Sequence, residues 1–132
     1  MSLQSLLLVG VGGFFGSACR FALSGHMLRP WSATFPFGTL AVNVLGSLAM
    51  GYVLAYLALR PGLSDSFRPL VVVGFLGGFT TFSAFSAETL GLLQSGHLLR
   101  AGLNVGLSVA LCLIAAALGF GAATWLHQTK GV

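Results

Sequence analysis

Hydrophobic residues run through this chain in four long stretches that are separated by short polar joints. The stretches cover residues 3–28, 37–59, 70–93 and 101–126, and each supplies the about 20 apolar residues that a helix needs to cross a bilayer. Proline, glycine and charged residues gather in the joints, where they end helices. The pattern predicts an all-α membrane protein with four transmembrane helices, a single domain over residues 1–132, and both termini on one side of the membrane.

Composition supports a surface that faces lipid. Hydrophobic residues make up 56% of the 132 positions and charged residues only 6%, which is too little polar surface for a soluble domain of this size. The net charge of +4 is spread thinly along the chain, without the basic cluster that follows a phosphate backbone. Nucleic acid is therefore excluded as a partner. The chain carries no ATP-binding motif or catalytic constellation, so we expect no enzyme.

Basic residues are almost evenly divided between the two predicted sides of the membrane. One side holds three and the other two or three: Arg60, Arg68 and Lys130 against Arg29, Arg100 and, if it leans that way, Arg20. Lys and Arg normally set the orientation of a membrane protein. So small a bias allows insertion in both orientations, and opposite copies could then pair about a two-fold axis in the membrane plane. A single dominant topology stays open as the alternative.

Small residues recur four positions apart in three of the stretches: Gly12 with Gly16, Ser47 with Gly51, and Gly102 with Gly106. This spacing lets helix backbones approach closely where lipid is as apolar as the helices. It favours a compact bundle or a dimer.

Polar residues also recur at helical spacing within two stretches: Thr39, Asn43 and Ser47 in the second, and Asn104, Ser108 and Cys112 in the fourth. Polar groups at bilayer depth need partners. Each stripe alone fits hydrogen bonding between helices as well as a functional role. Two parallel stripes in so short a chain favour a polar path through the membrane.

The third stretch contains a predicted helix break near its middle. Gly77 and Gly78 precede Thr80 and Thr81, and glycines next to β-branched residues form poor helix. The carbonyl groups of broken helices are commonly satisfied by a bound cation in transporters. A glycine kink whose carbonyls are satisfied by hydroxyl groups is an equally open interpretation.

Aromatic residues follow this break at steps of three: Phe79, Phe82 and Phe85, with Thr80 and Ser83 beside them. Such a row usually packs against other side chains. However, an aromatic ring has a positive edge that attracts anions, and amide and hydroxyl groups are neutral anion donors. A path lined in this way would hold a small anion weakly enough to release it.

Two charged residues lie inside the stretches. Arg20, late in the first, either extends to the membrane interface or raises the anion concentration at a pore mouth. Glu88, late in the third, either is interfacial or forms a hydrogen bond with a stripe residue.

Three motifs resemble those of one family: Gly12-Gly13-Phe-Phe-Gly16 through Arg20, Phe35-Pro-Phe-Gly-Thr-Leu-Ala-Val-Asn43, and Gly74-Phe-Leu-Gly-Gly-Phe-Thr-Thr-Phe-Ser-Ala-Phe-Ser. With these motifs in this order, the chain resembles the Fluc (CrcB-type) fluoride channel family over its whole length. The resemblance implies a fluoride-selective passive channel that exports cytoplasmic fluoride, as a multi-pass protein of the bacterial inner membrane. Hydrogen fluoride enters from an acidic exterior, ionises inside and is trapped, so a passive route lowers its toxicity.

The resemblance also implies an assembly and its sites. The assembly is a dual-topology antiparallel homodimer with two fluoride pores and a structural sodium ion at its centre. The sodium ligands would be the backbone carbonyls of Gly77 and Thr80. The pore would be lined by Phe82, Phe85, Asn43 and Ser83, with Arg20, Thr39, Ser108 and Glu88 along its polar track. The chain departs from the family pattern at Ala84, where threonine is frequent, and at Cys112, where a hydroxyl is expected, which questions the continuity of that track.

Two other functions compete with this one. A proton-coupled exporter similar to the small multidrug-resistance proteins is also short, four-span and dual-topology, but it depends on a carboxylate in the first span, where this chain has Arg20 and no acid. A membrane assembly factor without transport activity would need neither polar stripes nor a broken helix.

Overall fold

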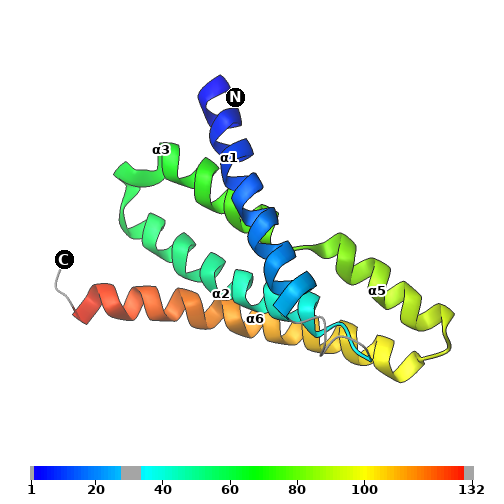
Figure 1. The fold of residues 1–132 in the computed structure, drawn as a ribbon. Helices are drawn as coiled ribbons and strands as arrows, with labels where there is room; N and C mark the ends of the chain where they lie inside the picture. The colour runs from blue at the N-terminus through cyan, green and yellow to red at the C-terminus, as the bar shows by residue number, and fades with distance from the viewer. Residues whose placement is uncertain (1, 28–33, 130–132) are drawn as a thin grey trace.

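Helices form every regular element of the computed structural model, which describes residues 2–27 and 34–129 (Figure 1). Four helical stretches are long and apolar enough to cross a membrane: Leu3–Gly25, Phe37–Leu59, Asp65–Gln94 and Leu98–Thr129. The predicted all-α fold with four spans is confirmed, and the second span coincides with its predicted bounds. Leu28, Arg29 and Lys130 lie outside the described residues.

The first two spans are continuous helices. Helix α1 (Leu3–Arg20) begins at Ser2, whose hydroxyl accepts a hydrogen bond from the Ser5 amide at 3.1 Å, and continues as the π-helix η1 (Phe21–Met27). Helix α2 (Phe37–Leu59) begins directly after Pro36, whose ψ of 59° lies outside the helical range.

The third span consists of several pieces. A short lead-in of η3 (Pro61–Leu63) and α3 (Ser64–Phe67) enters the π-helix η4 (Arg68–Leu76), which continues into α4 (Gly77–Phe79). The chain then leaves the helix at Thr80 and Thr81, whose backbones are extended with ψ of 158° and 115°. Helix α5 (Phe82–Gln94) follows the break.

The break is confirmed, but the glycines are not the unwound residues. Gly77 has helical angles of φ −65° and ψ −36°. The β-branched threonines are the extended residues, as their restricted side chains favour, and the Thr81 hydroxyl accepts a hydrogen bond from the Ala84 amide at 3.2 Å. Thr81 therefore acts as the N-cap that starts a new helix.

Close backbone contacts arrange the spans in two pairs. Helix α1 packs along η4, and α2 packs along α6 (Leu98–Thr129). The two helices within each pair run in the same direction (Figure 1). A Cβ atom at Gly12 or Gly16 would clash with the η4–α4 backbone, and one at Gly51 would clash with the α6 backbone. These glycines therefore allow the close approach of helix backbones that their spacing predicted. In contrast, a Cβ atom at Gly102 or Gly106 would meet no described atom within 4 Å.

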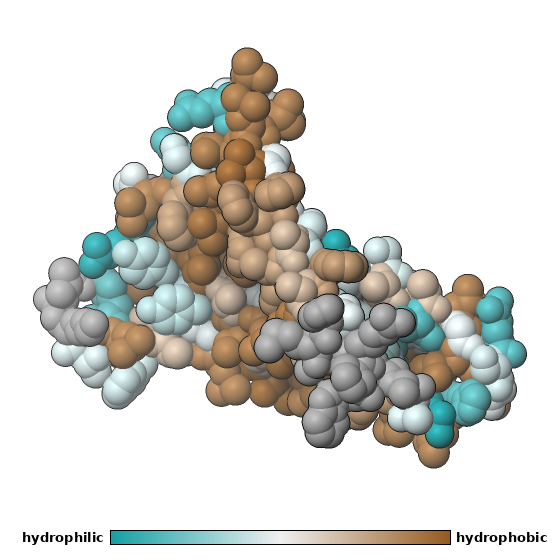
Figure 2. Space-filling model, in the orientation of Figure 1, coloured by the Kyte–Doolittle hydropathy of each residue, from teal (hydrophilic) through white to brown (hydrophobic). Residues whose placement is uncertain are grey.

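Apolar side chains cover much of the outer surface (Figure 2). Phe14 on α1 is 70% exposed and Phe82 on α5 is 78% exposed. Helix α5 diverges from the α1–η4 pair (Figure 1) and has no fully buried residue of its own. Such a surface requires lipid or another protein chain rather than water.

Candidate functional site

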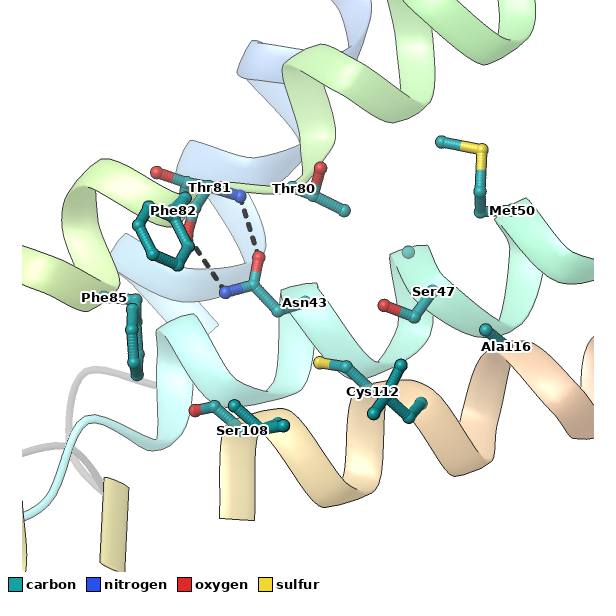
Figure 3. A pocket seen from close by; sticks show the side chains of 13 residues that line it. Asn43, Ser47, Met50, Thr80, Thr81, Phe82, Phe85, Ser108, Cys112 and Ala116 are labelled. Carbon is teal, nitrogen blue, oxygen red and sulfur yellow. Dashed lines mark hydrogen bonds between the residues drawn. The ribbon is translucent and has the colours of Figure 1, made fainter. Parts of the chain in front are cut away.

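The break in the third span is held by side chains from two other spans. The Asn43 amide on α2 binds both backbone atoms of Thr81: Oδ1 accepts from the Thr81 amide at 2.7 Å, and Nδ2 donates to the Thr81 carbonyl at 3.0 Å (Figure 3). From α1, Arg20 Nε donates to the Gly78 carbonyl at 3.0 Å. These backbone groups have lost helical partners and would be costly to leave unpaired in an apolar setting.

The Thr80 hydroxyl does not replace a lost helical bond. Thr80 Oγ1 donates at 2.9 Å to the Leu76 carbonyl, which already accepts from the Thr80 amide at 3.0 Å. The groups freed by the break are instead satisfied by other helices, because Asn43 binds the extended Thr81 and Arg20 binds Gly78 just before it. The break is thus a feature shared by three spans.

A cavity of about 440 Å³ lies beside the break, between α2, α5 and α6 (Figure 3). Its lining includes Asn43, Phe82, Phe85 and Ser108, four of the residues predicted for the pore. Ser47 and Cys112, one turn further along the two polar stripes, line it too. None of the described residues that line this cavity carries a formal charge. The two stripes and the start of α5 therefore meet at one neutral site.

The aromatic row divides at the break. Phe82 and Phe85 remain together, with ring centroids 5.3 Å apart and planes tilted by 44°. Phe79 instead stacks on Phe75, with centroids 6.1 Å apart and planes within 5° of parallel. The predicted three-residue row is wrong for Phe79, because the extended Thr80 and Thr81 interrupt the helical step between Phe79 and Phe82.

Other predicted site residues lie outside the lining of this cavity. Thr39 is buried on α2 and donates its hydroxyl to Glu88 Oε1 on α5 at 2.6 Å, so Glu88 does bond to a stripe residue. Glu88 Oε2 is buried and has no hydrogen-bond partner among the described residues. Ser83 is exposed, and its hydroxyl lies 3.3 Å from the Thr81 hydroxyl.

Two predicted roles change with the geometry. Arg20 donates to the Gly78 carbonyl beside the break, a structural contact that neither of its two predicted roles included. Asn104 is 1% exposed and donates to the Thr89 hydroxyl at 2.9 Å, so it joins α6 to α5 rather than lining the cavity. The fourth-span stripe thus has one structural residue and two cavity residues.

The sequence interpretation missed Thr81. This residue is 8% exposed, caps α5 and is the backbone partner of Asn43. The available signal was a threonine three residues before Ala84 at the start of a helical pattern, which is an N-cap signature.

Along the break, the backbone carbonyls predicted to bind sodium alternate with carbonyls that accept hydrogen bonds from side chains. Gly78 and Thr81 accept bonds from Arg20 and Asn43, while Gly77 and Thr80 are the neighbouring positions of the same break. Gly77 is exposed on this chain. Neutral carbonyl oxygens without a carboxylate suit a monovalent hard cation better than a divalent one. The donor set therefore fits a sodium ion.

Comparison with known proteins identifies the family. The family model described as "CrcB-like protein, Camphor Resistance (CrcB)" matches residues 7–120. This chain belongs to the CrcB family. A CrcB relative from Shewanella oneidensis, named "Fluoride-specific ion channel FluC", is 48% identical over 117 residues, which cover 89% of this chain and 94% of the relative. One of the same name from Opitutus terrae is 47% identical over 127 residues, 95% of this chain and 96% of the relative.

Membership of the CrcB family bears on the predicted family, the membrane location and the expected lack of enzyme activity. The resemblance stated from the three motifs is confirmed, and the chain is a multi-pass membrane protein. The expectation that it is not an enzyme is also confirmed, since its curated relatives are named as ion channels.

Proposed function

We propose that this protein is a fluoride-selective passive ion channel that lets cytoplasmic fluoride leave the cell and so lowers fluoride toxicity. The observation that carries the proposal is the neutral cavity in which Asn43, Phe82, Phe85 and Ser108 meet. The name shared by the CrcB relatives supports fluoride as the ion.

The chemistry of the cavity suits a small anion. One Asn43 Nδ2 hydrogen is used by the Thr81 carbonyl, and an amide nitrogen carries a second hydrogen that remains to bind an ion. The Ser108 hydroxyl adds a further donor, and ring edges at Phe82 and Phe85 add a weak positive potential. Because no formal charge lies in the lining, a bound anion is held weakly enough to leave.

The conducting unit is a homodimer of two copies in opposite orientations, with the pores completed between them. Support comes from the 78% exposure of Phe82 and from the absence of any fully buried residue in α5. Aromatic side chains this exposed on a site-forming helix call for a partner surface. The near balance of Lys and Arg between the two sides favours opposite insertion of that partner.

A structural sodium ion would be held at the break, between the two copies. Gly77 and Thr80 would hold it through their carbonyls, one pair from each copy, since side chains already occupy the carbonyls of Gly78 and Thr81. The ion would neutralise oxygen dipoles that otherwise face each other across the dimer.

The remaining track residues act around the cavity. Thr39 and Ser83 supply hydroxyls near the two ends of the Asn43–Phe85 region, and Glu88 orients Thr39 through their 2.6 Å bond. Arg20, on α1, supports the pore indirectly, because it holds the Gly78 carbonyl next to the break. Cys112 lies in the cavity lining, so a thiol replaces the hydroxyl expected there without removing the residue from the site.

Efflux from liposomes tests this function. Purified protein is reconstituted into vesicles loaded with potassium fluoride, a potassium ionophore balances the charge, and an electrode measures external fluoride. We expect rapid fluoride efflux that needs no pH gradient, with far slower efflux from chloride-loaded vesicles read with a chloride electrode. Efflux that depends on a proton gradient would favour the multidrug-type exporter. Efflux no faster than from protein-free vesicles would favour an assembly factor.

A further inference from the structure

A second cavity, of about 280 Å³, lies between the C-terminal ends of α2 and α6, away from the proposed pore. Its lining combines Arg60 and His127 with the rings of Tyr52 and Tyr56 and with apolar residues such as Leu126. Tyr52 follows Asn43 by nine positions, which places it about 180° around an α-helix from Asn43. The cavity therefore belongs to a different face of α2.

Its position in the spans is that of the membrane–water boundary. Arg60 is the first residue after α2, and His127 lies in the last turn of α6. Tyrosine and arginine concentrate at this depth, where rings contact acyl chains and charged groups reach the headgroups. The molecules available at such a place are lipids.

The charges of the cavity select an anionic partner. Arg60 is cationic, the His127 ring contributes an N–H donor, and no carboxylate is present among the described residues that line the cavity. The cavity between α1 and η4 offers a contrast, since Asp65 lines it together with Arg68 and would repel an anion.

Arg60 is also held in a suitable orientation. Its guanidinium carbon lies over the Tyr56 ring, 5.5 Å from the ring centroid, in a cation–π contact. The N–H donors of a guanidinium point outward along its edge, in a geometry that matches two oxygens of a phosphate.

We propose that this cavity binds an anionic phospholipid, with the headgroup phosphate on Arg60 and His127 and an acyl chain along the tyrosine and leucine side chains. Basic pockets between transmembrane helices bind lipid headgroups in this way. The volume suits a headgroup and the first part of one acyl chain, and the rest of the lipid would lie on the apolar surface outside the cavity. The inference does not depend on the ion that the protein conducts.

Native mass spectrometry of the detergent-purified protein tests the proposal, with phosphatidylglycerol and phosphatidylcholine of identical acyl chains as probes. We expect the wild-type protein to retain about fivefold more phosphatidylglycerol than phosphatidylcholine. Arg60→Gln should remove this preference without changing phosphatidylcholine retention, and Arg60→Lys should restore part of it. Arg100→Gln is the matched control, because this exposed arginine lies at the opposite end of α6, and it should retain the preference.

Folding of each variant is checked by its elution in size-exclusion chromatography. Equal retention of the two lipids by the wild-type protein would overturn the proposal even if a variant fails to fold. Equal loss of the preference in Arg60→Gln and Arg100→Gln would overturn it too, because binding would then follow total charge rather than this cavity.

Discussion

Asn43 connects the backbone of the broken span to the cavity beside it. Its side chain replaces two hydrogen bonds that Thr81 loses when the helix opens, and it lines the proposed ion path. Both roles require an amide, which offers a donor and an acceptor on one planar group. A leucine of similar size supplies neither, and a carboxylate supplies only acceptors.

Asn43→Asp therefore tests the residue. The change replaces the donor facing the Thr81 carbonyl with an oxygen, so we expect a loss of about 1–3 kcal/mol in the free energy of unfolding. We also expect fluoride efflux to fall sharply, because an acceptor then faces the anion. Thermal unfolding in detergent and efflux from liposomes measure the two effects. Wild-type values in both would show that the amide is not needed.

The residues of the site differ in how far the sequence alone could predict them. Asn43 and Ser108 follow from polar residues at four-residue spacing in apolar spans. Asn104 has the same spacing but bonds to Thr89, since spacing gives a helix face and not the neighbour that the face meets. Thr81 was missed because its role as the partner of Asn43 depends on an extended backbone that only the assembled helices stabilise.

At the scale of elements, glycines set the distance between α1 and the third span. Gly16 faces the Phe75 carbonyl and the Phe79 amide so closely that a Cβ atom would clash with both. Backbone atoms cannot move aside as a flexible side chain can. The approach of α1 then allows Arg20 to reach the Gly78 carbonyl.

Gly16→Ala should accordingly destabilise the protein by about 1–3 kcal/mol and weaken efflux by displacing the break. Gly10→Ala is the matched control on the same helix, since a Cβ atom there meets nothing within 4 Å. The control should leave stability unchanged or raise it by up to about 1 kcal/mol through helix propensity. Thermal unfolding of both variants decides, and equal stability would refute the packing role.

The sodium ion proposed at the break predicts ion-specific stability. Binding to the folded state adds about 2.7 kcal/mol when the free ion is at 100 times its dissociation constant. We expect the unfolding temperature to rise with sodium concentration against N-methylglucamine at constant ionic strength, and less with potassium. Unfolding at one temperature in all three salts would contradict a sodium site.

The elements themselves were largely predictable, with the break as the instructive exception. Four apolar stretches gave four spans, since length and hydropathy alone decide whether a helix can cross a bilayer. The break was expected over Gly77 and Gly78 together with the threonines that follow them, but only Thr80 and Thr81 leave the helix. A helix can accommodate glycine where a neighbouring helix packs against it, and Gly78 lies close to the Gly13 backbone. Tertiary packing therefore overrides the low helix propensity of Gly78.

The whole molecule, as proposed, is a pair of copies in opposite orientations. A C-terminal tag should therefore be accessible from both sides of the membrane, in roughly equal amounts, in labelling with an impermeant reagent. Two or three lysines added at the C-terminus should bias insertion to one orientation and abolish efflux unless an oppositely biased copy is co-expressed. Tags found on one side only in the unmodified protein would contradict the opposite-orientation dimer.

In the proposed channel, the ring edges of Phe82 and Phe85 line the path of the anion. Leucine keeps much of the volume but lacks the ring quadrupole, so Phe82→Leu and Phe85→Leu separate conduction from packing. Phe14→Leu is the matched control: Phe14 is 70% exposed against 78% for Phe82. The Phe14–Phe15 ring centroids are 5.3 Å apart, as are those of Phe82 and Phe85.

The decisive measurement is the rate of fluoride efflux from liposomes that contain each variant, with dimer recovery measured by size-exclusion chromatography on the same preparations. We expect at least a tenfold loss of rate in Phe82→Leu and Phe85→Leu, which corresponds to about 1.4 kcal/mol, with wild-type dimer recovery in both and a wild-type rate in Phe14→Leu. Wild-type efflux in both pore variants would contradict this role of the rings.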